Sequence, residues 1–213
     1  WAYRSLFNRV LQKEQQDVPV LLVHLGHSRT VLYVHHRGRP IAAREISWGG
    51  ADLSLALSTH LGISLQEADQ IKGDHGLMTS GPVDDPSSPE NRVASAMVET
   101  LQALIKEIRQ SCLTAKGLAQ TGVEKIYLTG KTSRLPGLVE YLEQETRIPT
   151  QMLRALSAIS NSGVKYAEDT DATFALAAGA GLALLSGDKN LLINLRKGPY
   201  ANDSGVGMIQ WKT

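Results

Sequence analysis

Apolar and polar positions along the chain predict a first part built from strands and a second part built mostly from helices. Residues 1–15 place apolar side chains on one face at helical spacing, which predicts a short amphipathic helix. The run "VPVLLVHLG" at 18–26 is apolar at nearly every position, as in a strand buried on both faces. Partial alternation continues around the turn "HRGRP" and predicts an antiparallel meander.

The hydrophobic period changes after the motif "WGG". Leucines recur at every fourth position from Leu53 to Leu61, and Ser64 followed by Glu67 forms a capping box, so we expect two helices here. Residues 73–90 are rich in Gly, Pro, Asp and Ser and have little to bury. This composition is typical of a surface loop.

The second part of the chain continues with a long helix and a β, turn, α, β unit. The helix has Ser88 as its candidate N-cap and Pro89 at its first position, and it is predicted to end near Gly117. Residues 124–155 show a short buried strand, a turn, a helix and an edge strand. Residues 171–185 are so rich in Ala and Gly that their helix should pack closely against another backbone.

Composition excludes several classes of function. The 22 Lys and Arg residues nearly balance the 21 Asp and Glu residues, which gives no general attraction to nucleic acid or to anionic lipid. The single cysteine, Cys112, excludes an intramolecular disulfide framework and suits a reducing compartment. The chain begins at Trp1 and contains no apolar run of about 18 residues. We therefore expect an excised domain whose membrane contacts, if it has them, are made through segments outside it.

Four of the six histidines lie in the stretch "VHLGHSRTVLYVHHRG" at 23–38. His35 and His36 are adjacent on a predicted strand and should point to opposite faces, so they do not form a metal site together. The turn "GHSRT" offers backbone N–H groups and hydroxyls that can cradle a phosphate. An ordinary hairpin turn has the same composition, so this stretch alone leaves both interpretations open.

A second glycine-containing turn follows the predicted strand "YLT" and lies within "YLTGKTSRLPGLVEYL" at 127–142. In open α/β sheets, nucleotides bind beside turns at the carboxyl ends of strands. The alternative is that Gly130 and Gly137 only allow the chain to bend tightly.

Together, these stretches make the sequence resemble the second half of the actin-like ATPase superfamily, most closely its bacterial PilM and FtsA branch. The resemblance lies in residues 20–72, 126–152 and 172–184. It implies an α/β fold of the actin-like, ribonuclease H-like type: a mixed five-stranded sheet flanked by helices, with a small subdomain inserted. It also implies that a retained nucleotide site would include Gly26, Ser28, Thr30, Thr129, Gly130 and Ser133.

Two positions depart from the family pattern. His24 stands where the second phosphate loop usually has an aspartate that helps to hold hydrated magnesium, and imidazole is a poor substitute for a hard oxygen ligand. Lys131 stands where the adenosine loop usually has a second glycine. We therefore expect no cofactor: ATP and magnesium are disfavoured by His24 and Lys131, and no metal site is predicted.

The C-terminal segment narrows the resemblance to one branch of the family. The segment "LLINLRKGPYA" at 191–201 resembles the Ile-Asn-Leu segment with which PilN docks onto PilM, with Leu192, Asn194 and Leu195 as its docking residues. An alternating segment of this kind can add a strand to a sheet edge, although a plain C-terminal strand is the alternative. A PilM-like domain that carries the segment in cis is the arrangement of the L protein of type II secretion, GspL.

The predicted organisation is a leading helix at 1–17, an actin-like domain at 18–189 with an inserted subdomain and loop at 48–90, and a strand and tail at 190–213. The favoured function is a non-catalytic scaffold of type II secretion at the cytoplasmic face of the bacterial inner membrane.

By resemblance, its partners would be the secretion ATPase (the E protein) and inner-membrane platform proteins, and a homodimer is allowed. The alternatives are a PilM-like pilus assembly protein that binds ATP and a PilN-type peptide, and an FtsA-like nucleotide-dependent polymer.

Overall fold

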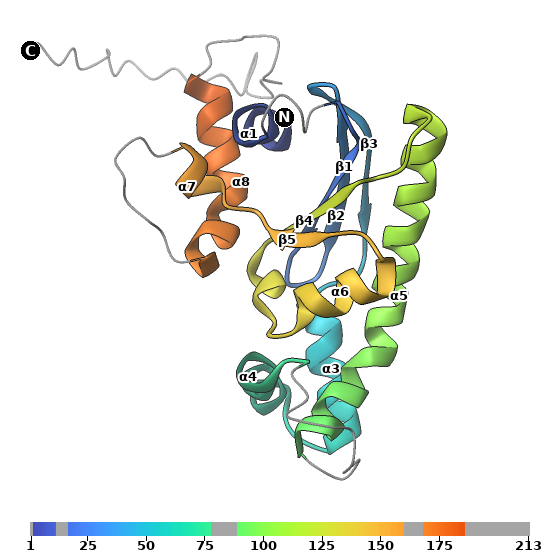
Figure 1. Cartoon of the computed structure of the whole chain (residues 1–213). Helices are drawn as coiled ribbons and strands as arrows, with labels where there is room; N and C mark the ends of the chain where they lie inside the picture. Colours follow the sequence, from blue (N-terminus) through green and yellow to red (C-terminus); the bar gives the residue numbers. More distant parts are fainter. Residues whose placement is uncertain (1, 12–16, 78–88, 160–167, 186–213) are drawn as a thin grey trace, which may run out of the picture.

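A computed structural model describes residues 2–11, 17–77, 89–159 and 168–185. Its centre is a five-stranded sheet in the order β3-β2-β1-β4-β5 (Figure 1). The strands are β1 (Val20–Leu25), β2 (Thr30–His36), β3 (Arg39–Ile46), β4 (Lys125–Thr129) and β5 (Thr150–Met152). The first three form an antiparallel meander, while β4 and β5 run parallel to β1. The predicted mixed sheet is therefore confirmed.

Helices cover both faces of this sheet and extend beyond one end of it (Figure 1). One face is covered by α1 (Ala2–Val10), α7 (Ala155–Ile159) and α8 (Glu168–Leu185). The other is covered by α5 (Pro89–Ala119) and α6 (Leu138–Thr146), while α3 (Gly50–Leu61) and α4 (Leu65–His75) form the small subdomain. A short 3-10 helix, η1 (Lys131–Arg134), follows β4.

The apolar run of β1 is explained by the two layers that it separates. Leu21 and Val23 belong to the core shared with α3, α5 and α6, whereas Val20 and Leu22 belong to the core beneath α1 and α8. Only His24 in this strand is less than fully buried. Because both faces are covered, the strand has no need of the alternation that a half-exposed strand shows.

Helix boundaries follow the predicted capping signals closely. The hydroxyl of Ser64 accepts from the backbone of Glu67, and Glu67 accepts from the backbone of Ser64, which is the predicted capping box. The long helix α5 begins at Pro89 as predicted but continues past Gly117 to Ala119. Ser88, the predicted N-cap, lies outside the described residues, as does the predicted strand segment at 190–201.

The Ala- and Gly-rich helix α8 packs closely against another backbone, as its composition predicts. A Cβ atom on Gly179 would lie 2.4 Å from the carbonyl oxygen of Ala2, so glycine is the residue that lets α8 approach α1. The same interface also covers a buried cluster of aromatic rings, in which Phe7 of α1 contacts Tyr33 and His35 of β2.

His35 lies entirely inside this layer. Burial, followed by the positive charges of Arg4 and His36, lowers the pKa of the His35 imidazole to about 4. The ring is therefore neutral near neutral pH.

Candidate functional site

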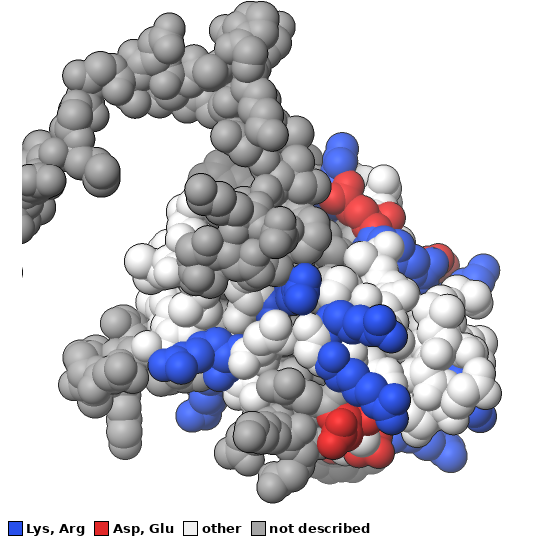
Figure 2. Space-filling model, turned by 90° about the horizontal axis from the view of Figure 1, so that it is seen from above, with Lys and Arg blue, Asp and Glu red and all other residues white. Residues whose placement is uncertain are grey.

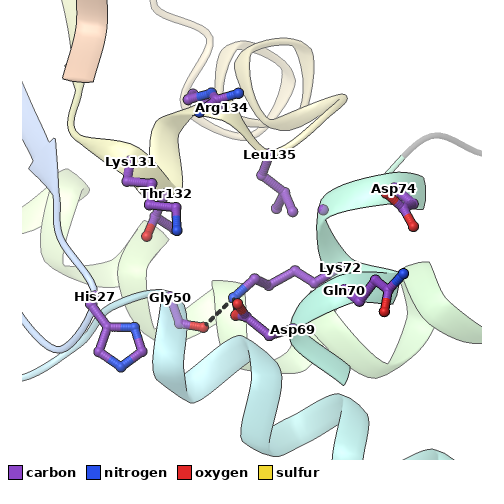
Figure 3. Close-up of a pocket in the computed structure, with 11 residues that line it drawn as sticks. His27, Gly50, Asp69, Gln70, Lys72, Asp74, Lys131, Thr132, Arg134 and Leu135 are labelled. Atoms are coloured by element: carbon purple, nitrogen blue, oxygen red, sulfur yellow. Dashed lines mark hydrogen bonds and ion pairs between the residues drawn. The ribbon is translucent and has the colours of Figure 1, made fainter. Parts of the chain in front are cut away.

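The candidate site lies at the end of the sheet where β1 and β4 finish. The two strands are parallel, so the turn after β1, which starts at Gly26, lies beside the turn after β4, which starts at Gly130. A cavity of about 340 Å³ opens there between η1 and α4 (Figure 3). Ligand pockets of proteins span about 300–1,000 Å³, so this cavity belongs to the lower end of that range.

Four segments line the cavity. The turn after β1 contributes His27, and the start of α3 contributes Gly50. The remaining lining residues come from α4 and from the η1 turn: Asp69, Gln70, Lys72, Gly73, Asp74, Lys131, Thr132, Arg134 and Leu135. The small subdomain and the sheet therefore form opposite walls.

Backbone hydrogen bonds fix the turn after β1 against the small subdomain. The N–H of Gly50 donates to the carbonyl of Gly26 at 3.0 Å, and the hydroxyl of Thr132 donates to the same carbonyl at 2.8 Å. A Cβ atom on Gly50 would lie 2.5 Å from Thr132 Oγ1, so the second glycine of "WGG" is required for this close contact.

This turn also presents unused donors. The backbone N–H groups of His27 and Ser28 make no hydrogen bond within the part of the chain that the structure describes, and both side chains are exposed. Successive N–H groups in a turn form a concave site for anions. Of these two residues, His27 lines the cavity, whereas the nitrogen of Ser28 lies close to Gly49.

On the opposite wall, Lys72 reaches from α4 to the start of α3 (Figure 3). Its Nζ donates to the carbonyl of Gly50 at 2.9 Å and to Ser54 Oγ at 2.7 Å, and it pairs with Asp69 Oδ1 at 2.5 Å. The hydrogen bond from Lys72, and then that from Ser54, lowers the pKa of the Asp69 carboxyl. The exposed Lys131 on η1 also lowers it through its charge.

His24, the departure at the end of β1, does not line the cavity. Its ring lies against Tyr3 of α1, with 5.9 Å between ring centroids. Burial lowers the pKa of its imidazole, and its Nδ1 has no partner among the described residues. The position therefore holds a neutral ring on the face of the sheet beneath α1.

No three His, Cys, Asp or Glu side chains within the described ranges are placed to hold a metal ion together. The acids that line the cavity are Asp69 and Asp74 of α4.

A sequence model of a protein family, the type IV pilus assembly protein PilM, matches residues 1–186 of the chain. This match covers most of the sequence. The chain belongs to the PilM family of type IV pilus assembly proteins.

Solved structures with the same fold include this family and other actin-like proteins. A PilM–PilN type IV pilus biogenesis complex is 22% identical, covers 85% of this chain and 49% of that chain, and has a TM-score of 0.67. MreB5 of Spiroplasma citri bound to AMPPNP is 11% identical, with coverages of 89% and 60% and a TM-score of 0.61. The archaeal actin homolog Ta0583 is 17% identical, with coverages of 87% and 54% and a TM-score of 0.59.

These likenesses confirm the predicted actin-like fold. The chain spans about half the length of the PilM chain and of Ta0583, and about three-fifths of that of MreB5. None of the helices in the described ranges combines the length and the hydropathy needed to span a bilayer.

The structure brings the six predicted nucleotide residues to the same end of the sheet but gives them different surroundings. Gly26 and Ser28 lie in the turn after β1. The other hydroxyls donate to backbone carbonyls: Thr30 to Trp48, Thr129 to Ala172 and Ser133 to Gly130. Thr30, Thr129 and Ser133 are buried. The first two hydroxyls join distant segments and the third stabilises its own turn, so a role in binding nucleotide stays a prediction.

The wall that α4 contributes was not predicted from the sequence. Asp69 and Lys72 are three residues apart on a helix, which places both side chains on one face, and this spacing was the available signal. The docking residues Leu192, Asn194 and Leu195 lie outside the described residues.

Proposed function

We propose that the chain acts in type IV pilus assembly as a PilM-type scaffold at the cytoplasmic face of the bacterial inner membrane. The observation that carries this proposal is the family match over residues 1–186. It favours the pilus system over type II secretion, which the sequence alone favoured. One of the similar solved structures is a complex of PilM with PilN, which supports a partner of the PilN type for this chain as well.

The scaffold role includes no hydrolysis of ATP. Magnesium requires oxygen ligands in near-octahedral geometry. The β1 end offers the neutral ring of His24 instead of a carboxylate, and the ring is turned toward Tyr3. Of the two acids that line the cavity, Asp69 is already paired with Lys72. These features support a protein that binds its partner without hydrolysing ATP.

An extended segment with the Ile-Asn-Leu pattern is the proposed ligand of the scaffold. Fluorescence anisotropy of a labelled peptide with the sequence of residues 191–201 tests this. The protein in this assay should carry Leu192→Asp and Leu195→Asp, so that its own segment does not compete. We expect saturable binding of the peptide and none of a matched peptide with Asp at the same two positions. Equal binding of both peptides, or of neither, would refute the partner proposal.

A second candidate function is the binding of a nucleotide, and the cavity favours it. The N–H of His27, which makes no hydrogen bond with a described residue, suits a phosphate, and Lys131 adds a positive charge to the same cavity. A ligand that binds only the folded protein stabilises it by about 2.7 kcal/mol at a hundredfold excess over its Kd.

A melting experiment with ATP, with and without magnesium, tests this second candidate. For a chain of this size the expected stabilisation raises the Tm by about 5–11 °C. No shift would exclude nucleotide binding and leave the scaffold proposal intact. Release of phosphate above the rate without protein would refute the non-catalytic part of the proposal.

A further inference from the structure

The end of the sheet opposite the cavity collects positive charges from separate elements. The hairpin between β2 and β3 carries Arg37 and Arg39. His35, next to this hairpin, pairs with Val20 at the start of β1. Val20 in turn pairs with Lys125 at the start of β4. Three cations therefore lie where β1 and β4 begin, at the far end from Gly26.

Two helices add to this end. Tyr3 of α1 contacts His24, whereas Phe7 contacts His35, so α1 runs toward the hairpin and Arg9 in its last turn lies there. The last turn of α5 carries Lys116, and only a short connection joins it to the start of β4 (Figure 1). We call Arg9, Arg37, Arg39, Lys116 and Lys125 the basic end.

None of these five cations forms an ion pair with a residue that the structure describes. Among the described residues, Asp17 lies beside His36 of the β2–β3 hairpin, and Glu124 directly precedes Lys125. Figure 2 looks down on this face and shows Lys and Arg side chains spread across it with few acidic ones. The small subdomain differs, since α3 and α4 carry Asp52, Glu67, Asp69 and Asp74 against one lysine, Lys72. Lys131 and Arg134 of η1 line the cavity beside it.

The basic end also exposes apolar side chains and holds an arginine in an unfavourable place. Leu113 and Leu118, near the end of α5, are 64% and 59% exposed. Arg37 has a φ of +50° in the two-residue turn with Gly38, a conformation that favours asparagine or glycine. The turn therefore carries a charge at the expense of local stability.

We infer that the basic end binds an anionic lipid surface. Clusters of cations with adjacent exposed leucines are attracted to acidic headgroups and can bury their apolar side chains at the lipid interface. This inference goes beyond the proposed scaffold function and does not depend on the partner peptide. It orients the chain with the basic end on the membrane, and with the cavity and the acidic small subdomain facing away from it.

Vesicle sedimentation tests the inference. The protein is mixed with vesicles of phosphatidylcholine alone or of equal phosphatidylcholine and phosphatidylglycerol, and the bound fraction gives a partition coefficient. We expect binding only to the anionic vesicles, and its loss in 1 M salt, where the screening length falls to about 3 Å. Each neutralised cation should lower the coefficient about fivefold, so Arg37→Asn with Arg39→Thr should lower it about 25-fold.

The variant is designed to keep the fold. Asparagine suits the conformation of residue 37, so the melting temperature should stay equal or rise while lipid binding falls. Arg92→Ala with Lys106→Ala removes two exposed cations from other parts of α5 and is the matched control, which should bind as the parent does.

Equal binding to neutral and anionic vesicles, or equal binding by the two double variants, would overturn the inference. Absence of vesicle binding together with salt-sensitive binding to poly-glutamate would also overturn it, and would assign the basic end to an acidic protein. Because the vesicles contain no protein, a negative result here leaves the peptide experiment unaffected.

Discussion

The ammonium group of Lys72 links the two helices of the small subdomain beside the cavity. It donates to the Gly50 carbonyl at 2.9 Å and to Ser54 Oγ at 2.7 Å, both in α3, and it pairs with Asp69 in its own helix. The Lys72 side chain is 13% exposed, while that of Asp69 is 55% exposed. The bonds to α3 are therefore the shielded part of the network, and Lys72→Met, which keeps the alkyl stem, should weaken the contact between α3 and α4.

The expected loss in the free energy of unfolding is about 2 kcal/mol. A hydrogen bond from a charged donor contributes about 1.5–3 kcal/mol. The pair with Asp69 adds at most about 1 kcal/mol, because water screens an exposed partner. The Ser54 hydroxyl donates to Asp69 Oδ1 at 2.8 Å and also lies 3.2 Å from the Gly50 carbonyl. It can turn to that carbonyl when the ammonium group is removed, so the loss stays near the lower end of the range.

Urea unfolding followed by circular dichroism measures this loss, and a thermal scan should show a Tm about 4–8 °C lower. The matched control is Lys106→Met, because Lys106 is exposed on α5 and has no hydrogen bond or ion pair with a described residue. If the two variants differed by less than about 0.5 kcal/mol, the ammonium of Lys72 would not be joining the helices, and the proposed wall of the cavity would need another support.

Two further predictions concern the layer beneath α1 and α8. Gly179→Ala should lower the free energy of unfolding by about 1–3 kcal/mol, because the new Cβ atom would meet the Ala2 carbonyl at 2.4 Å. The control is Gly181→Ala, whose Cβ atom would have nothing within 4 Å, and it should raise the free energy of unfolding by about 0.5–1 kcal/mol. Urea unfolding measures both changes. The pKa of His35 falls from 6.5 in the unfolded chain to about 4 in the folded protein. Between these two pH values the unfolded chain is protonated at His35 and the folded protein is not. Stability should therefore fall by roughly 3 kcal/mol between pH 6.5 and pH 4, and urea unfolding of His35→Gln should show a flatter pH profile over this interval.

The sequence predicts most of the fold because local rules and tertiary packing agree in it. The unbroken apolar run of β1 predicts burial on both faces, and α1, α5 and α8 supply the two covers. The Ser64 capping box predicts the start of α4 to the residue. The short elements η1 and α7 were not predicted, since stretches of four or five residues carry too little periodicity to be recognised.

The candidate site was predicted less completely because its two walls are far apart in the sequence. The turns at Gly26 and Gly130 contain glycines and follow strands, so local composition indicates them. The contact of Lys72 with Gly50, and that of Thr132 with Gly26, depend on how the small subdomain folds back over the sheet. Spacing on α4 shows that Asp69 and Lys72 share a face, but only the tertiary structure shows that this face borders a cavity.

His24 connects the sequence departure with the architecture. An aspartate at the end of β1 needs magnesium or hydrogen-bond donors beside it, because an unpaired carboxylate is costly to bury. Here the position lies against Tyr3, under a helix that also covers His35 and Tyr33. A neutral imidazole is the less costly group in that layer, since burial already lowers its pKa. The substitution therefore suits a chain in which α1 is fixed to the sheet by aromatic contacts.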